Sequence, residues 1–315
     1  MKALICGIGG QDGGYLARFL LQKNYEVWGT SRDASGARFG NLARLEIAEQ
    51  VQLLSMDPED FRSVLVAFQR SQADEVYYLA GQSSVALSFE QPAETMQSIV
   101  LGTLNLLEAC RMTDRPVRLY CAGSSESFGN TMGAPATEQT PFSPRSPYAV
   151  GKASAHWLVN NYREAYKLHA CTGILFNHES PLRPARFVTQ KIISAARRIA
   201  AGSTEKLRMG RLDIARDWGW APEYVDAMWR MLQQPQPGDY VIATGQTNTL
   251  EQFVAESFAA LGLDWRGHVE QDPSLFRPTD LQISRADPSE ARRKLGWQAN
   301  FMMRDVIKGM LDEAG

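Results

Sequence analysis

Short apolar runs alternate with longer stretches of helical period from the start of this chain. The runs predicted to be strands lie at residues 3–6, 26–29, 51–54, 75–79, 118–121, 170–176 and 240–243. Helical spacing is found at residues 14–22, 59–71, 93–112, 146–166 and 250–261. Strands that alternate with helices form a parallel sheet covered by helices on both faces. We therefore predict an α/β fold with a doubly wound parallel sheet.

A glycine-rich turn follows the first predicted strand and opens the first predicted helix. It reads Gly7-Ile8-Gly9-Gly10-Gln11-Asp12-Gly13, with a GxxGxxG spacing at Gly7, Gly10 and Gly13. Glycines there permit a tight turn, close approach of the backbone to a pyrophosphate, and helix amides that face negative charge. We predict that the turn binds a dinucleotide cofactor through Gly7, Gly9, Gly10, Gln11, Asp12 and Gly13.

The residues after the second and third strands bear on the choice of dinucleotide. An NAD-preferring dehydrogenase usually has an acid at the end of the second strand. Here Ser31 and Arg32 can instead donate hydrogen bonds to a 2'-phosphate, which favours NADP. Asp33 keeps NAD open, because a shift of one position would make it the ribose acid. Asp57 is placed either to meet the adenine edge or to cap a helix.

The alternation breaks down after residue 176. Pro181 and Pro184 interrupt a loop, an amphipathic stretch follows at 188–201, and the C-terminal part is rich in Pro, Arg and Asp. We expect residues 1–176 to form mainly the cofactor-binding domain, to which the strand and helix near 240–261 return. Residues 177–315 should form mainly a smaller substrate-binding lobe.

Composition narrows the class of partner. The chain has 33 Lys and Arg against 35 Asp and Glu, and this balance gives no reason to expect nucleic acid or an anionic membrane. No apolar stretch approaches the roughly 18 residues of a membrane span, and the first apolar run enters glycines instead of a cleavage site. We expect a cytoplasmic protein with a small-molecule partner. The dispersed cysteines Cys6, Cys110, Cys121 and Cys171 are predicted to be buried thiols.

Two further segments carry catalytic residue types. Tyr148 and Lys152 are four residues apart, hence on one helix face. A nearby cation lowers the pKa of a phenol, so the tyrosine can exchange a proton with a substrate hydroxyl, while the lysine also reaches the nicotinamide ribose. Ser124 and Glu126 follow the fifth strand, where side chains face the ligand crevice. Together these segments resemble the extended short-chain dehydrogenase/reductase superfamily.

Glu126 adds a carboxylate that simple hydride transfer does not need. Once C4 of a sugar is oxidised, the C5 proton is acidic, and a carboxylate can remove it and expel the C6 hydroxyl as water. The alternative is a helix cap or a loop salt bridge.

Longer runs are similar to the GDP-mannose 4,6-dehydratase family. They lie at residues 141–148, 161–166, 173–181 (GILFNHESP), 187–189, 216–219 (RDWG) and 240–245 (YVIATG). The resemblance covers nearly the whole chain. It implies an NADP-binding Rossmann domain, a smaller sugar-nucleotide lobe, and a lyase that converts GDP-mannose into GDP-4-keto-6-deoxymannose. By matching positions, Ser124 stands in place of the family's catalytic threonine, Glu126 is the acid/base, and Tyr148 and Lys152 form the base pair.

The same resemblance implies further ligand contacts. The cofactor would be contacted by Leu79, Ala80, Gln82, Ser83, Lys152, His178 and Arg183. The sugar nucleotide would be contacted by Ser84, Asn177, Glu179, Lys191, Arg216, Tyr224 and Arg277. Arg216 and Arg277 suit the pyrophosphate, because a guanidinium can form two parallel hydrogen bonds. Leu182 breaks the HExxH pattern that starts at His178, so we expect no metal.

Some positions depart from the family's pattern. Gly9 replaces threonine, Pro184-Ala185-Arg186 replaces Gly-Glu-Thr, Arg211 replaces asparagine, and residues 30–40 lack the paired arginines near tetramer contacts. Ser124 keeps the hydroxyl of threonine without its methyl group. We expect a homo-oligomer, either dimer or tetramer. A GDP-4-keto-6-deoxymannose reductase, a dehydratase of another nucleotide sugar, and a binding protein without catalysis stay open as alternatives.

Overall fold

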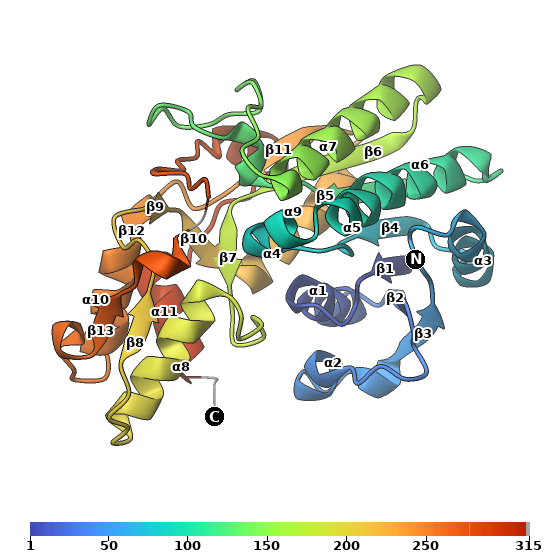
Figure 1. Cartoon of the computed structure of the whole chain (residues 1–315). Helices are drawn as coiled ribbons and strands as arrows, with labels where there is room; N and C mark the ends of the chain where they lie inside the picture. Colours follow the sequence, from blue (N-terminus) through green and yellow to red (C-terminus); the bar gives the residue numbers. More distant parts are fainter. Residues whose placement is uncertain (277, 313–315) are drawn as a thin grey trace.

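A seven-stranded parallel sheet forms the centre of the computed structural model, which describes residues 1–276 and 278–312 (Figure 1). The strand order is β11-β6-β5-β4-β1-β2-β3. The chain starts in the middle of the sheet, runs out to β3, and returns through β4 toward the opposite edge. The predicted doubly wound sheet is therefore confirmed. The order reverses between β1 and β4, where ligands bind in folds of this kind.

All seven predicted strands are present. They are β1 (Lys2–Cys6), β2 (Glu26–Ser31), β3 (Val51–Ser55), β4 (Glu75–Tyr78), β5 (Arg118–Ala122), β6 (His169–Leu175) and β11 (Asp239–Ile242). Their central members are almost completely buried. This burial explains the continuous apolar runs, because a parallel strand is covered on both faces.

Helices cover the sheet on both faces. One layer contains α1 (Gln11–Gln22) and α9 (Ala221–Gln233); the other contains α3 (Phe61–Ser71), α6 (Gly102–Met112) and α7 (Pro147–Tyr166). Leu16 and Met228 are buried in the first layer, and Val64, Leu106 and Val159 in the second. The two helix layers leave the carboxyl ends of the central strands uncovered, and the candidate site lies at these ends.

Short elements complete the sheet's connections. They are α2 (Gly40–Arg44), η1 (Ala48–Gln50), α4 (Val85–Glu90), α5 (Pro92–Met96) and the 3₁₀ helix η3 (Ser125–Phe128). A π-helical turn, Gln97–Leu101, joins α5 to α6. The predicted helix at 93–112 is thus continuous but contains a π-helical turn.

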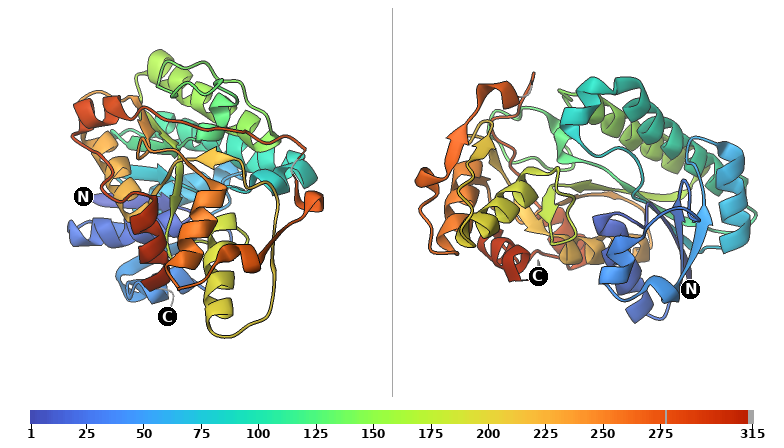
Figure 2. Two further views of the ribbon diagram at one scale, coloured as in Figure 1. Left: turned by 90° about the vertical axis from the view of Figure 1, so that its left-hand side faces the viewer. Right: turned by 60° about the horizontal axis from the view of Figure 1, so that its bottom comes forward.

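A smaller lobe lies beside the sheet (Figure 2). Its helices are α8 (Val188–Ala200), α10 (Leu250–Ala259) and α11 (Met303–Asp312). Its strand pairs are β7 (Asn177–Glu179) with β10 (Trp218–Trp220), β9 (Ala215–Arg216) with β12 (Asn248–Thr249), and β8 (Leu207–Met209) with β13 (Val269–Gln271). The smaller lobe has short helical turns at Trp265–Gly267 and Pro273–Leu275, whereas the turn at Ala291–Leu295 packs against α9 and β11. Ile192, Phe253 and Val306 share its core.

The C-terminal half differs from the sequence analysis in two respects. Helix α9 is not predicted, although Pro222 stands in its first turn and its buried apolar residues repeat at helical spacing. Strand β11 returns to the sheet beside β6. Helix α10, which we expected to return with it, packs against α8 and α11 instead, because Phe253 and Phe258 belong to the core of the smaller lobe.

The four cysteines are buried free thiols, as predicted. Over residues 1–276 and 278–312, no helix is both long and apolar enough to span a membrane.

Candidate active site

The backbone of the glycine turn is packed too tightly for side chains at two positions. Gly7 has a φ of +91°, and a Cβ there would lie 2.9 Å from the Cα of Ala80. A Cβ on Gly13 would lie 2.7 Å from the Cα of Ile8. Helix α1 begins directly after Gly10, whose N-cap position provides no side-chain hydrogen bond. The first helix amides therefore have no side-chain cap, an arrangement that fits a dinucleotide pyrophosphate.

The loop after β2 contains Arg32 and Asp33, the two candidate contacts to the adenosine ribose of the cofactor. Ser31 ends the strand, and Arg32 follows it as an exposed side chain. The Oδ1 atom of Asp33 accepts hydrogen bonds from the backbone N–H groups of Ser35 (3.0 Å) and Gly36 (2.9 Å). The Asp33 carboxylate thus closes its own turn, although its side chain is exposed like that of Arg32.

Asp57 stabilises the loop that precedes α3. Its Oδ1 accepts a hydrogen bond from the backbone N–H of Glu59 at 3.0 Å. The N-cap of α3 is Asp60, which accepts from Arg62. Asp57 therefore shapes a turn, but it is not the helix cap.

The loop after β4 starts beside the glycine turn. The backbone N–H of Leu79 donates to the carbonyl of Cys6 at 3.0 Å, and Ala80 packs on Gly7. Gln82 donates to the carbonyl of Ser84 at 2.8 Å, and the Ser84 hydroxyl caps α4. Ser83 is exposed. The structure thus places Leu79 and Ala80 at the predicted cofactor turn and gives Ser84 a capping contact.

Four predicted catalytic residues meet at the carboxyl end of β5. Ser124 is the N-cap of η3, and its Oγ accepts a hydrogen bond from the N–H of Glu126 at 3.3 Å. Tyr148 hydrogen-bonds to Ser124 and interacts electrostatically with Glu126. Lys152 donates from Nζ to the carbonyl of Ala122 at 2.8 Å, and this Nζ lies 5.9 Å from the centre of the Tyr148 ring. The structure therefore brings Ser124, Glu126, Tyr148 and Lys152 together.

Local sequence places Tyr148 at the start of α7. Ser146 is the N-cap, with its hydroxyl accepting from the N–H of Ala149 at 3.1 Å, and Pro147 occupies the first helical position. Proline suits that position because its N–H is not needed there. The phenol consequently lies at the positive end of the helix dipole, which favours a phenolate.

Burial nevertheless has the largest effect on the pKa values of the predicted catalytic pair, Tyr148 and Lys152. Tyr148 is only 9% exposed. Burial raises its pKa to about 12, although the hydrogen bond from Ser124 and the charge of Arg183 lower it. Burial also lowers the pKa of Lys152 to about 8. The lowering of the Tyr148 pKa that we predict for Lys152 is not seen in this structure, in which burial raises that pKa and the Lys152 ammonium donates to the carbonyl of Ala122.

The start of α1 is tied to β7. The Oδ2 atom of Asp12 lies 2.9 Å from Nε2 of His178, whose Nδ1 contacts the Phe176 carbonyl at 2.8 Å. Gln11 donates to the His178 carbonyl at 3.1 Å and accepts from the Ser180 hydroxyl at 2.7 Å. Burial opposes ionisation of Asp12, but His178 outweighs it and holds the pKa of Asp12 at about 2. Both ring nitrogens of His178 therefore have protein partners.

Glu179 and Arg183 form a second buried connection. An oxygen of Glu179 accepts from the Thr189 hydroxyl at 2.6 Å and contacts Nε of Arg183 at 3.2 Å. The Arg183 guanidinium lies 3.8 Å from the centre of the Phe187 ring. The positive charge of Arg183 also lowers the pKa of Tyr148, one of the predicted catalytic residues.

Arg216 is held by the smaller lobe. Its Nη1 donates to the carbonyls of Ala215 (2.9 Å) and Leu281 (2.7 Å), and its Nη2 contacts Asp280 at 3.0 Å. A cavity of about 130 Å³ adjoins this pair and is lined by Asn130, Arg145, Thr279, Asp280, Leu281 and Gln282. Asp280 could not be found from the sequence, because an isolated carboxylate in a proline-rich stretch forms no recognisable pattern.

The other predicted substrate residues differ in accessibility. Asn177 is half-buried at the start of β7, and Lys191 is exposed on α8. Tyr224 is 0% exposed and stacks on His178 at 4.6 Å between ring centres. We therefore treat Tyr224 as a core residue. Arg277 lies outside the described residues. Among the residues that the structure describes, no group of three or more His, Cys, Asp or Glu could hold a metal ion.

Comparison with known proteins gives consistent matches. The family model for GDP-mannose 4,6 dehydratase matches residues 4–310. GDP-mannose 4,6 dehydratase 1 of Arabidopsis thaliana is 46% identical over 99% of this chain and 89% of its own length. The GDP-mannose 4,6-dehydratase of Sinorhizobium fredii is 43% identical over 99% of this chain and 95% of its own length. A solved UDP-glucose 4-epimerase of Thermus thermophilus, in complex with NAD, is 25% identical, with a TM-score of 0.84 and coverage of 98% and 99%.

Proposed function

Since this chain belongs to the GDP-mannose 4,6-dehydratase family, we propose that it is a lyase that converts GDP-mannose into GDP-4-keto-6-deoxymannose. The observation that carries this proposal is the meeting of Ser124, Glu126, Tyr148 and Lys152 at one end of β5. A hydroxyl, a phenol and an ammonium suit proton exchange at a sugar hydroxyl, and the added carboxylate suits removal of a carbon-bound proton.

NADP is the proposed cofactor, and the residues present fit it. The glycine turn would hold the pyrophosphate on the amides at the start of α1. Ser31 and exposed Arg32 would meet the 2'-phosphate, while the Asp33 carboxylate is engaged in its own turn. Lys152 would reach the nicotinamide ribose. Bound at this turn, NADP would supply reversible hydride transfer, so the reaction would be redox-neutral and need no external reductant.

Tyr148 would accept the proton of the C4 hydroxyl. Its pKa of about 12 means that the phenol is protonated at neutral pH in this structure. Accepting a proton requires the phenolate, so groups that lower this pKa assist the step. Ser124 does so by hydrogen bonding to the phenol, as do the charge of Arg183 and the helix dipole. The ammonium of Lys152, one helical turn away, would stabilise the phenolate.

Glu126 would carry out the elimination. Its carboxylate would remove the C5 proton, which the new C4 carbonyl makes acidic. The electron pair of the C5–H bond would form the C5–C6 double bond, and the C6 hydroxyl would leave as water after receiving a proton from Glu126. Hydride return to C6, with protonation of C5 by Glu126 after it takes a proton from water, would then restore a saturated sugar and leave the C4 ketone. Tyr148 would release the C4 hydroxyl proton to water.

A dehydratase of another nucleotide sugar is the second candidate. Arg211, which replaces the family's asparagine, contacts Asp213 at 2.9 Å and Gln282 at 3.1 Å. Gln282 also lines the cavity beside the Arg216–Asp280 pair. A changed residue beside a pair proposed to bind pyrophosphate favours testing other bases and sugars alongside GDP-mannose.

Proton NMR tests the proposal. GDP-mannose is incubated with the protein and a catalytic amount of NADP. A new C6 methyl doublet and loss of the C6 hydroxymethyl signals are expected without added reductant. In D₂O, deuterium should appear at C5 because Glu126 exchanges its proton. Unchanged GDP-mannose in the presence of bound NADP contradicts the assignment. Oxidation of NADPH by GDP-4-keto-6-deoxymannose would then favour the reductase.

A homo-oligomer, either dimer or tetramer, is also proposed. Helix α7 exposes Trp157 by 62% and, seven residues earlier, exposes Val150. Contiguous exposed apolar patches mark protein interfaces, and the spacing of seven residues places both side chains on one helix face. Light scattering measures the mass, and Trp157→Glu should lower it to that of a monomer. A monomeric wild-type protein would contradict this proposal.

A further inference from the structure

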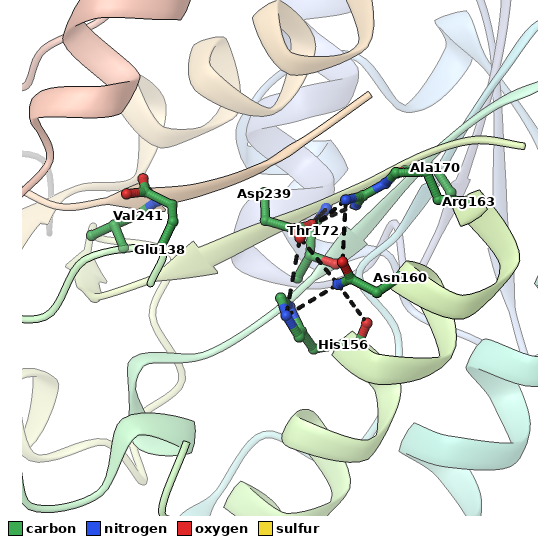
Figure 3. Close-up of polar contacts among 8 residues, drawn as sticks. All are labelled: Glu138, His156, Asn160, Arg163, Ala170, Thr172, Asp239 and Val241. Atoms are coloured by element: carbon green, nitrogen blue, oxygen red, sulfur yellow. Dashed lines mark hydrogen bonds and ion pairs between the residues drawn. The ribbon is translucent and has the colours of Figure 1, made fainter. Parts of the chain in front are cut away.

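The catalytic face of α7 continues into a buried polar cluster. At steps of three or four residues, this face carries Tyr148, Lys152, His156, Asn160 and Arg163. Residues with this spacing lie along one side of a helix. The first two form the catalytic pair, whereas the last three converge on Asp239 of β11 (Figure 3).

Asp239 anchors the C-terminal half of α7 to the sheet. Its Oδ1 accepts from Nη2 of Arg163 at 2.6 Å and from the backbone N–H of Thr172 at 3.1 Å. Its Oδ2 accepts from Nη1 of Arg163 at 3.1 Å and from Asn160 at 3.0 Å. Nε of Arg163 donates to the carbonyl of Ala170 at 2.8 Å. A bidentate guanidinium–carboxylate pair defines orientation as well as distance, so α7 is fixed to both β6 and β11.

The pair is shielded from water. The Arg163 and Asp239 side chains are 19% and 14% exposed. Their attraction lowers the pKa of Asp239 against the effect of burial, so the carboxylate is charged at neutral pH. Removing one partner would leave the other charged group buried without compensation. The contact is therefore stronger than an exposed ion pair and can hold a helix in place.

The cluster also reaches the segment that carries Glu126. The Nε2 of His156 lies 3.1 Å from the amide nitrogen of Asn160. The His156 ring packs edge-on against Phe142 at 4.8 Å between centres, and Phe142 packs against Phe128 at 5.2 Å. Phe128 ends η3, two residues after Glu126. The polar cluster thus supports both catalytic segments.

We propose that Asp239 is a positioning residue, which sets the tilt and axial position of α7 through Arg163 and Asn160 and so places Tyr148 and Lys152. Tyr148 and Arg163 are separated by 15 residues, which span about 22 Å of helix. Over that length, a tilt of about 3° displaces the phenol by about 1 Å. A misplacement of this size can reduce a rate by about 100-fold. Loss of the Asp239 contact would therefore lower the reaction rate, although Asp239 does not touch the substrate.

The activity test compares two Asp→Asn variants and rests on the proposed function. Asp239→Asn keeps the shape but turns an N–H donor toward Arg163. We expect its kcat to fall about tenfold or more, with KM for GDP-mannose and the NADPH Kd within about twofold of wild type. Asp226→Asn is the matched control. It breaks another Asp–Arg pair, with Arg230 at 2.8 Å on α9, and should leave kcat unchanged.

A second readout does not depend on the substrate. Fluorotyrosine is placed at position 148, and its ¹⁹F shift is titrated with pH in the NADPH complex. The midpoint should differ from wild type in Asp239→Asn but not in Asp226→Asn. Arg163→Lys, which keeps the charge but loses the bidentate contact, should give a smaller change and replaces Asp239→Asn if that variant does not fold.

The outcomes separate the two proposals. Wild-type kcat and an unchanged fluorine midpoint in folded Asp239→Asn would overturn the positioning role. So would a loss of kcat that only follows the folded fraction measured by circular dichroism. If the wild-type protein does not convert GDP-mannose, the proposed function fails, whereas the fluorine titration still decides whether Asp239 positions Tyr148.

Discussion

Replacing Gly13 with alanine should weaken cofactor binding while leaving the sheet intact. The new Cβ would lie 2.7 Å from the Cα and 2.9 Å from the carbonyl carbon of Ile8. Carbon atoms prefer separations of about 3.5–4.0 Å, so the turn must open by nearly 1 Å. Since both neighbours are backbone atoms, no rotamer change relieves the clash. Overpacking of this kind costs about 1–3 kcal/mol of stability.

The opened turn should lose amide contacts with the pyrophosphate. A hydrogen bond to a charged group contributes about 1.5–3 kcal/mol, so each lost contact weakens NADPH binding by roughly 10- to 100-fold. Titration of NADPH fluorescence measures this Kd, and thermal unfolding reports the stability. Gly267→Ala in the smaller lobe is the control, because a Cβ there would meet nothing within 4 Å. A Gly13→Ala protein that binds NADPH within twofold of wild type would refute the reasoning.

Three more substitutions test the site. Glu126→Gln should lower kcat by about 10²- to 10⁴-fold; assays of 4-keto product would reject Glu126 as the base if kcat stayed near wild type. Ser124→Thr should raise kcat modestly, because the methyl group restrains the hydroxyl; steady-state kinetics that show a decrease would contradict this. Asp12 has a pKa of about 2, and the pKa of His178 is raised. The Asp12 contribution is lost as pH falls through about 2, and the His178 contribution is lost as pH rises through its raised pKa. Asp12→Asn should therefore cost most stability between about pH 4 and 6.5; a cost independent of pH in urea unfolding would exclude this ion pair.

The central sheet could be predicted because its signal is local. A parallel strand covered by helices must be apolar along its whole length, and all seven such runs became strands. The fold of the smaller lobe was harder to predict. Its short strand pairs, such as β9 with β12, contain few residues, and their partners are distant in sequence. Helix α9 did have a periodic apolar face, but the loss of alternation around it concealed its relation to the sheet.

In the candidate site, too, local features could be predicted from the sequence and features that depend on packing could not. Spacing alone placed Tyr148 and Lys152 on one helix face and the glycine turn at the start of α1, because a helix turn is a local geometry. The pKa of Tyr148 could not be predicted from the sequence, since desolvation depends on every element packed around the phenol. The sequence likewise grouped Tyr224 with ligand contacts, whereas packing placed it under His178 in the core.

The sequence by itself therefore determined the alternation of strands and helices in the first half of the chain, the glycine turn and the choice of candidate catalytic groups. Only the tertiary structure decided which charges face each other. Asp12 meets His178 across 166 residues, Arg216 meets Asp280 across 64, and Arg163 meets Asp239 across 76. Such pairs leave no pattern in a single sequence, because their energy comes from proximity and burial that exist only when distant segments pack together.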